Sequence, residues 1–264
     1  MNNSSDYIPP KKRSLGQNFL KDSSVCHRIV KNLDIQTEDC ILEIGPGAGA
    51  LSHLLAEKPP RQMLLLEKDR FWAFKHGEWA KQYSFPYQPI LMDALDFPWE
   101  RLLGNWKIAG NLPYNVASPL IWDIISQAKD YSLAVFMVQK EVGQRMAAPP
   151  GGREYGALSV WVQSFCRVER LFIVPPGAFD PKPKVDSAVM RLTPLKQPLH
   201  CPAEKLSQLL KICFQQRRKQ LKNILRQYWT PSVELFLQSH NLTGEIRPES
   251  LTPVQFQKLT NILL

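Results

Sequence analysis

Seven short apolar runs recur along the first 195 residues, and most are separated by stretches with helical periodicity. Strands that are apolar on both faces are typical of a parallel sheet covered by helices on each side. The sequence therefore predicts one α/β domain over residues 1–195, built on a seven-stranded sheet of the Rossmann-like type. The runs occupy residues 41–44, 63–67, 89–93, 107–111, 132–138, 167–174 and 187–193.

The pattern changes after Pro194 and Pro198, where helical periodicity continues without further strand-like runs. Helices are expected over 203–227 with a break, over 231–240 and over 252–263. Residues 196–264 are therefore predicted to form a small all-α domain. Near the other end of the chain, Asp22 is expected to cap a helix whose apolar positions share one face.

Charge is distributed unevenly between these two regions. The whole chain carries a formal net charge of +9, and residues 196–264 hold ten basic and four acidic residues. Such a basic segment favours a nucleic-acid partner, with Arg145 and Arg153 either adding contacts or remaining ordinary surface charges. The predicted RNA-binding residues, placed along the helix expected over 203–227, are Arg217, Arg218, Lys219, Lys222 and Arg226.

Composition also argues against several classes of protein. No apolar run approaches the roughly 18 residues of a membrane span, and the first residues lack the apolar stretch of a signal peptide. The five cysteines are scattered without a Cys-x-x-Cys pair, which indicates neither a disulfide framework nor a metal site. We therefore expect a cytoplasmic protein that binds no metal.

A glycine-rich turn follows the first predicted strand, in the segment EIGPGAG at 43–49. There Gly45 and Gly47 let the backbone approach a ligand closely. Carboxylates end the next two strands, where Glu67 can accept from ribose hydroxyls and Asp93 lies nearby. The acidic surroundings and the Gly-x-Gly-x-Gly spacing favour a ligand with ribose, adenine and an amino-acid portion. Two alternatives are a dinucleotide cofactor, whose usual spacing is Gly-x-Gly-x-x-Gly, and carboxylates that only cap the following helices.

The fourth strand ends in the tetrapeptide Asn111-Leu112-Pro113-Tyr114. The Asn111 amide oxygen and the Leu112 carbonyl can accept from an exocyclic amine, and the Tyr114 ring can stack on a base. Pro113 stiffens the turn. Adenine N6 is a poor nucleophile that needs positioning more than a strong base. The alternative is a simple turn with a buried tyrosine.

Five short motifs mark a resemblance, namely GQNFL (16–20), EIGPGAG (43–49), EKD (67–69), DAL (93–95) and NLPYN (111–115). With them the chain resembles the ribosomal RNA adenine dimethyltransferases, and within these the small-subunit branch. Further agreement lies in residues 153–160, 174–192 and 214–225. One departure is Met92, which stands where the family commonly has glycine.

The resemblance implies S-adenosylmethionine as the cofactor and a class I methyltransferase sheet. It implies a catalytic role for the tetrapeptide and for Phe179, which would stack on the base opposite Tyr114; the alternative is a core phenylalanine. Small side chains at Ala117 and Ser118 are expected to leave room for a monomethylated amine. Together with Gly47, the residues expected at the cofactor are Asn18, Leu20, Gly45, Glu67, Asp93, Ala94 and Asn111.

The substrate that the resemblance implies is small-subunit (16S) rRNA in an immature 30S subunit, bound by a monomeric enzyme during ribosome biogenesis. Two adjacent adenosines in the 3′-terminal hairpin loop would each be methylated twice, after leaving their stack. Two alternatives are a large-subunit adenine dimethyltransferase and a nucleic-acid-binding factor without catalysis. Residues 174–187 and the basic C-terminal segment favour the small-subunit enzyme, and the intact tetrapeptide favours catalysis.

Overall fold

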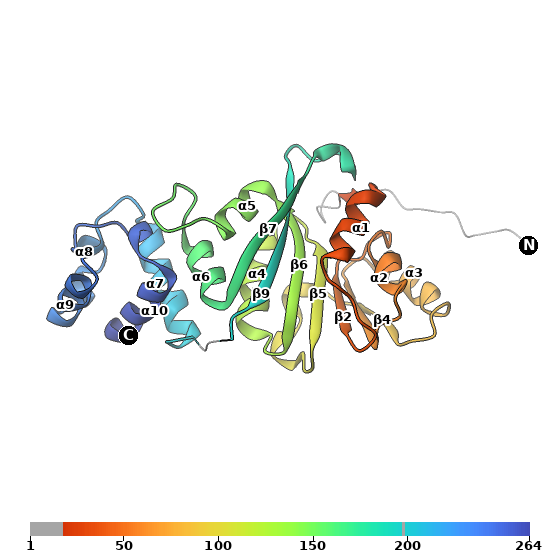
Figure 1. The fold of residues 1–264 in the computed structure, drawn as a ribbon, viewed down its shortest axis with the longest axis horizontal. Helices are drawn as coiled ribbons and strands as arrows, with labels where there is room; N and C mark the ends of the chain where they lie inside the picture. The colour runs from red at the N-terminus through yellow and green to blue at the C-terminus, as the bar shows by residue number, and fades with distance from the viewer. Residues whose placement is uncertain (1–17, 197–198) are drawn as a thin grey trace, which may run out of the picture.

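The computed structural model describes residues 18–196 and 199–264. Its centre is a seven-stranded sheet in the order β4-β3-β2-β5-β6-β9-β7 (Figure 1). The strands are β2 (Cys40–Ile44), β3 (Gln62–Glu67), β4 (Tyr87–Leu91), β5 (Trp106–Asn111), β6 (Tyr131–Gln139), β7 (Cys166–Val174) and β9 (Ser187–Pro194). The predicted class I methyltransferase fold is confirmed, and each expected strand is present within two residues of its expected start and end.

One strand departs from the all-parallel sheet that the apolar runs indicate. β9 pairs antiparallel with both β6 and β7, whereas the other neighbouring strands of this seven-stranded sheet pair parallel. The link from β7 to β9 contains a 3-10 turn at Pro176–Ala178 and the short strand β8 (Phe179–Asp180), but no α-helix. A parallel return needs a long crossover, so this link leaves β9 antiparallel to its neighbour.

Helices cover both faces of the sheet. α1 (Ser23–Lys31) and α2 (Ser52–Ala56) pack on one apolar cluster, with α3 (Arg70–Ala80) beside β4. Asp22 caps α1 as expected, since its side chain accepts from Ser24 N and Val25 N. The opposite face is covered by α4 (Ala117–Gln127), α5 (Lys140–Met146) and α6 (Ala157–Phe165).

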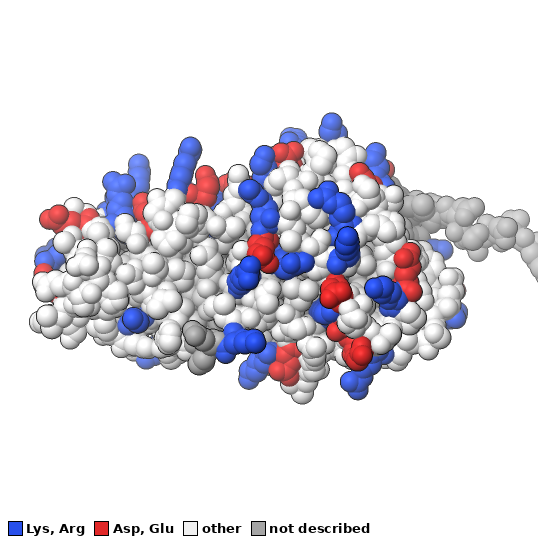
Figure 2. Space-filling model, in the orientation of Figure 1, with Lys and Arg blue, Asp and Glu red and all other residues white. Residues whose placement is uncertain are grey.

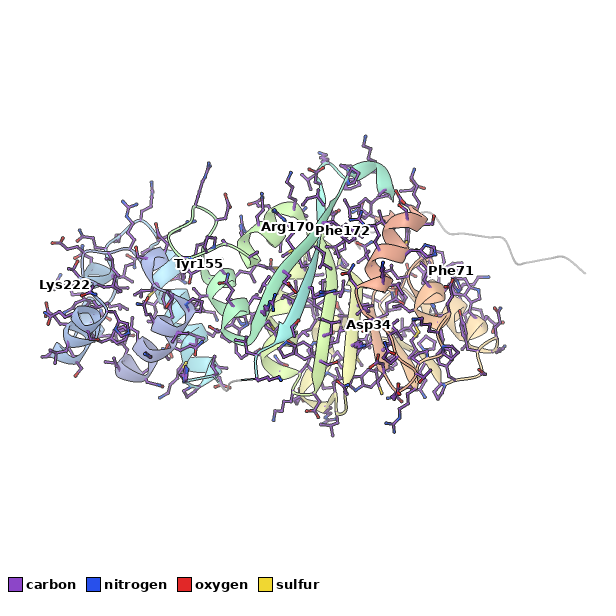
Figure 3. The ribbon with its side chains drawn as sticks, viewed as in Figure 1. Asp34, Phe71, Tyr155, Arg170, Phe172 and Lys222 are labelled. Carbon is purple, nitrogen blue, oxygen red and sulfur yellow. The ribbon has the colours of Figure 1, made fainter. Side chains whose placement is uncertain are left out.

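The helical C-terminal residues pack against α6. They form α7 (Ala203–Gln215), α8 (Leu221–Ile224), α9 (Pro231–Ser239) and α10 (Pro253–Leu263), and they share one buried apolar cluster with the sheet. At this junction the hydroxyl of the fully buried Tyr155 donates to the Leu251 carbonyl at 2.9 Å (Figure 3). The two predicted domains are therefore joined by a continuous core.

The helix expected over 203–227 is interrupted where the basic residues lie. α7 ends at Gln215, and residues 216–218 form a turn before α8. The next residues bond to a distant part of the chain. Leu221 N donates to the Ile246 carbonyl, and Lys222 N donates to the Gly244 carbonyl. Tertiary contacts thus override the helical propensity of this stretch.

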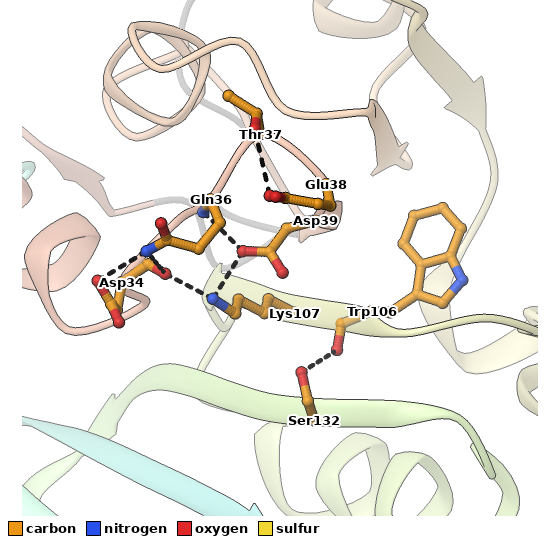
Figure 4. Close-up of polar contacts among 8 residues, drawn as sticks. All are labelled: Asp34, Gln36, Thr37, Glu38, Asp39, Trp106, Lys107 and Ser132. Carbon is orange, nitrogen blue, oxygen red and sulfur yellow. Dashed lines mark hydrogen bonds and ion pairs between the residues drawn. The ribbon is translucent and has the colours of Figure 1, made fainter.

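The link between α1 and β2 is fastened at the edge of the sheet where β2 and β5 begin (Figure 4). Lys107, at the start of β5, donates to the Asp34 carbonyl at 2.5 Å and pairs with the Asp39 carboxylate at 2.6 Å. The same carboxylate accepts from Gln36 N at 2.7 Å. The Lys107 and Asp39 side chains are only 12% and 8% exposed. This ion pair therefore lies largely out of water.

We expect Asp39→Ala to lower the free energy of unfolding by about 3 kcal/mol, because it leaves the Lys107 ammonium unpaired in a largely buried place. Adding Lys107→Met should recover part of the loss. The neighbouring exposed Glu38 offers a matched control, and Glu38→Ala should change the value by less than about 0.5 kcal/mol. Chemical denaturation measures all three. Equal small losses for Asp39→Ala and Glu38→Ala would contradict the assignment.

Candidate active site

A pocket opens at the carboxyl edge of the sheet, beyond the ends of β2, β3, β4 and β5. Open α/β sheets bind ligands at this edge. Most of the residues that the sequence predicts for the site line this pocket. They are Asn18, Gly45, Gly47, Glu67, Asp93, Ala94, Asn111, Leu112, Pro113 and Tyr114, with Met92 also in the wall.

Two predicted site residues do not line the pocket. Leu20 in β1 (Phe19–Leu20) faces Phe179 in β8 across a two-stranded antiparallel ladder. Both side chains lie in the apolar cluster beneath α1, and Phe179 is 1% exposed. This placement is that of a core phenylalanine. To stack on a base, the Phe179 ring would have to leave the cluster, so its stacking role stays a prediction.

The glycine turn adopts a left-handed backbone at three of its residues. Gly45, Gly47 and Gly49 have φ values of 65°, 50° and 84°. A Cβ atom added to Gly47 would lie 2.7 Å from a ring carbon of Phe19. Phe19 therefore covers this turn, and its ring packs edge-on against Trp72 of α3 at 5.6 Å. Sequence reasoning selected the two neighbours of Phe19 and missed Phe19 itself.

Glu67 holds the glycine turn through a buried hydrogen bond. Its Oε2 accepts from Gly47 N at 2.9 Å, and its Oε1 accepts from Asp69 N at 2.7 Å. Burial raises the pKa of Glu67, and the bonds from the Asp69 and Gly47 amides oppose that rise. Each oxygen keeps a second lone pair. The carboxylate is thus fixed in place and can still accept bonds from a ligand.

Asp93 both caps a turn and lines the pocket. Its Oδ1 accepts from Leu95 N at 3.1 Å at the start of the 3-10 turn Ala94–Asp96, and Lys68 Nζ donates to its Oδ2 at 2.5 Å. Partial burial acts to raise its pKa, but the bonds from Lys68 and Leu95 outweigh this and lower it. The capping alternative therefore applies to Asp93 without removing it from the pocket wall.

Glu43 lies outside the pocket lining, although it comes directly before the glycine-rich turn in the sequence. It is 2% exposed, and its Oε2 accepts from the Ser52 hydroxyl at 2.6 Å. Burial raises the pKa of Glu43 to about 8, and the nearby Glu67 adds to the rise. Glu43 is therefore mostly protonated at neutral pH.

The tetrapeptide lines the same pocket and follows β5, the strand that pairs with β2. Asn111 Nδ2 donates to the Asn18 carbonyl at 2.9 Å. Because a carbonyl only accepts, this bond identifies the nitrogen end of the Asn111 amide and leaves Oδ1 as an acceptor. The Leu112 side chain is buried, so Leu112 can serve a ligand mainly through its backbone.

Tyr114 is anchored at the tip of its ring. Its hydroxyl and that of Ser187 at the start of β9 lie 2.6 Å apart, while its ring lines the pocket. Burial raises the pKa of Tyr114, so it stays neutral at physiological pH. Ala117 and Ser118 do not line the pocket, where Val116 and Leu120 stand instead. The two small side chains that were expected to leave space for a monomethylated amine are therefore not in the pocket lining.

The basic C-terminal residues differ in how their charges are used. Arg217 donates to the Arg153 carbonyl and lies 3.8 Å from the Glu249 carboxylate, and Lys222 pairs with Glu234 at 3.9 Å. Within the described ranges, no ion pair engages the exposed residues Arg218, Lys219 and Arg226. Figure 2 shows Lys and Arg side chains projecting from the edge of the helical region.

Within residues 18–196 and 199–264, no group of three or more His, Cys, Asp or Glu side chains is placed to hold a metal ion. No helix in these ranges combines the length and the apolarity needed to cross a membrane.

The strand order and the pocket define the chain as a protein of the class I methyltransferase fold. A family model described as ribosomal RNA adenine dimethylase matches residues 9–264, and the chain belongs to this family.

Three proteins illustrate the similarity. The ribosomal RNA small subunit methyltransferase A of Oleidesulfovibrio alaskensis is 51% identical over 260 residues, which cover 97% of this chain and 92% of that protein. A dimethyladenosine transferase from Plasmodium falciparum has a TM-score of 0.77 at 26% identity, covering 91% of this chain and 95% of its own. The 23S rRNA methyltransferase ErmE has a TM-score of 0.73 at 26% identity, covering 93% and 99%.

Glu43→Gln tests the protonated state of the buried carboxyl. A folded-state pKa of about 8 against an ordinary value of 4.5 means that the native state binds an extra proton between these values, so stability falls as pH rises through them. Glutamine can still accept from Ser52 and does not ionise. We expect the free energy of unfolding of the wild type to fall more steeply than that of Glu43→Gln between pH 5 and pH 8, measured by denaturant titration. Parallel profiles would show that Glu43 is not perturbed.

Proposed function

We propose that the chain is an S-adenosylmethionine-dependent methyltransferase that dimethylates N6 of two adjacent adenosines in the 3′-terminal hairpin loop of small-subunit (16S) rRNA. It would act as a monomer on an immature 30S subunit in the cytoplasm. One observation carries this proposal: a single pocket joins the glycine turn and the Glu67 carboxylate to the wall formed by Asn111 and Tyr114.

The pocket residues fit the proposed cofactor in both shape and charge. Glu67 presents buried carboxylate oxygens that can accept from ribose hydroxyls, and Gly47 allows close approach of the ligand. Asp93 and Ala94 line the same pocket, and the proposed adenine ring would lie beside them. Carboxylates suit a ligand that carries a sulfonium and an ammonium group, whereas a pyrophosphate would be repelled. When bound, the cofactor supplies an electrophilic methyl group.

The tetrapeptide is suited to hold the amine that receives this methyl group. Asn111 Oδ1 and the Leu112 carbonyl can accept the two N6 hydrogens, and the Tyr114 ring can stack on the base. No strong base is required, because the amine becomes acidic only as its bond to carbon forms. Positioning and hydrogen bonding by these three residues then account for most of the acceleration.

The similarity to named proteins supports small-subunit rRNA as the substrate. The relative named as a small-subunit methyltransferase is 51% identical to this chain, whereas the 23S rRNA methyltransferase is 26% identical. Both share the fold, so the architecture by itself does not separate the two substrates. The choice between the two subunits therefore depends on the sequence.

A transfer assay tests the substrate directly. The protein is incubated with labelled S-adenosylmethionine and, separately, with immature small subunits, large subunits or protein-free rRNA, and modified adenines are mapped by mass spectrometry. We expect dimethylated adenine at two adjacent positions of small-subunit rRNA. Label confined to large-subunit rRNA would contradict the proposal, and RNA binding without any label would leave only a nucleic-acid-binding role.

Asn111→Ala serves as the catalytic control in this assay. It removes the side-chain acceptor while leaving the exposed basic residues unchanged, so we expect transfer to fall at least about 100-fold with RNA affinity largely retained. Loss of RNA binding in parallel with activity would indicate a structural role instead.

The basic C-terminal residues are expected to differ in their contribution to RNA binding, because some are already bonded within the protein and others are not. Replacing Arg218 and Lys219 together by alanine should weaken RNA binding and reduce the slope of log K against log salt by about 2, because two free cations are lost. Arg217→Ala should change the slope less and lower the thermal stability, because its guanidinium bonds to Arg153.

The matched control for this experiment is the pair Lys58 and Arg61, both exposed and next to the start of β3, at the opposite edge of the sheet from the pocket. Replacing them by alanine removes the same charge and should leave the slope nearly unchanged. Filter binding over a salt series measures the slopes. A slope that depends only on total charge would contradict the proposed contact.

A further inference from the structure

A buried histidine lies directly behind the glycine turn. His76, on α3, is completely buried, and its Nε2 lies 2.9 Å from the Gly47 carbonyl. Its Nδ1 lies 2.6 Å from the hydroxyl of Tyr87 on β4. Figure 3 shows the side chains of α3, where Phe71 is labelled, at the end of the sheet that carries β4. Neither His76 nor Tyr87 lines the pocket.

The chemistry of the partners settles the tautomer of His76. A backbone carbonyl can only accept, so Nε2 must carry the proton and donate to Gly47. A neutral ring then has an unprotonated Nδ1, which accepts from the Tyr87 hydroxyl. Burial lowers the pKa of His76 to about 4, which keeps the ring neutral at physiological pH. The three groups therefore form one directed chain of hydrogen bonds.

Gly47 is consequently held on both of its backbone polar groups. Its N–H donates to Glu67 and its carbonyl accepts from His76, and its φ of 50° lies in the left-handed region. The glycine turn would otherwise be one of the more adaptable segments of the pocket, since glycine has more backbone freedom than any other residue. Two buried bonds from two different elements restrict that freedom before any ligand binds.

A second pair, His53 and Tyr83, lies close to the pair of His76 and Tyr87 and can be compared with it. His53 Nδ1 lies 3.0 Å from the Tyr83 hydroxyl, and the Tyr83 ring stacks on that of Tyr87 at 4.7 Å. His53 and His76 both pack against Trp79 at 4.8 Å. The His53 ring makes no described hydrogen bond to the glycine turn, and His53 reaches the turn only through its backbone N–H, which donates to the Gly49 carbonyl at 3.2 Å. The His76 ring, in contrast, donates to the Gly47 carbonyl.

We propose that His76, oriented by Tyr87, is a positioning residue that presets the glycine turn for the cofactor. This inference rests on the proposed use of S-adenosylmethionine. A turn that is already in its binding conformation loses less entropy when the ligand binds, so the bond contributes to affinity although His76 never touches the ligand. The residues that hold the target amine follow β5, and His76 and Tyr87 make no described hydrogen bond to them.

The test compares cofactor binding by four variants of the full chain, using calorimetry with S-adenosylmethionine and S-adenosylhomocysteine. His76→Phe removes both bonds and should raise Kd about tenfold, and Tyr87→Phe, which frees the ring of His76, should raise it about threefold. His76→Gln keeps an N–H donor for Gly47 and should restore Kd to within about threefold of the wild type. Tyr83→Phe makes the same chemical change as Tyr87→Phe in the same cluster and should leave Kd within about twofold.

Turnover separates positioning from general damage to the fold. At saturating cofactor and rRNA, kcat should stay within about twofold of the wild type in Tyr87→Phe, while KM for the cofactor rises with Kd. If His76→Phe does not fold, the comparison of Tyr87→Phe with Tyr83→Phe and the rescue by His76→Gln still decide the question.

Several results would overturn the inference. Wild-type Kd in folded His76→Phe, or equal weakening by Tyr87→Phe and Tyr83→Phe, would show that the hydrogen-bonded chain does not preset the turn. A fall in kcat with unchanged KM would indicate loss of active protein instead. Wild-type protein that binds neither ligand would overturn the proposed function, and this inference with it.

Discussion

The site depends on the hydrogen bond between the Gly47 amide and the Glu67 carboxylate. It joins the turn after β2 to the end of β3. These two strands are paired in parallel, so their carboxyl ends lie at the same edge of the sheet. A carboxylate is costly to bury alone, and two backbone amides compensate Glu67. Because this bond fixes the turn, it holds Gly45 in the lining of the pocket. It also keeps Gly47 in contact with the Phe19 ring, which occupies the space that a side chain at position 47 would need.

The sheet and the central residues of the site could be predicted from the sequence. Strands buried on both faces are uniformly apolar, and parallel strands bring their carboxyl ends to one edge, so the motifs after β2, β3 and β5 had to meet. The direction of β9 could not be predicted this way, because an apolar run carries no direction. The pairing of Leu20 with Phe179 could not be predicted from the sequence either, because two-residue strands far apart in the chain leave no periodic pattern.

The sequence shows where basic residues occur, but it does not show which of their side chains are already bonded within the protein. Arg217 and Arg218 are adjacent, yet the first is bonded to the Arg153 carbonyl and the second is exposed, with no ion pair to any described residue. The same segment was expected to lie along a helix with a break, and the sequence did not show where the break would fall. Its turn is instead held by backbone bonds from residues 221 and 222 to residues 246 and 244. Both features depend on contacts between segments distant in the chain, which local sequence does not record.

The layer beneath the glycine turn is polar but largely uncharged at neutral pH. Burial raises the pKa of Glu43 and lowers that of His76, and each shift favours the neutral form. Burial also raises the pKa of Glu67, but the Gly47 and Asp69 amides that donate to its two oxygens oppose that rise and stabilise the charged form. Negative charge thus reaches the pocket wall mainly through Glu67, because Asp93 is paired with Lys68, while neutral hydrogen bonds behind the wall hold its shape. A cationic ligand with ribose hydroxyls needs both features, since the carboxylates attract it and the rigid turn admits it closely.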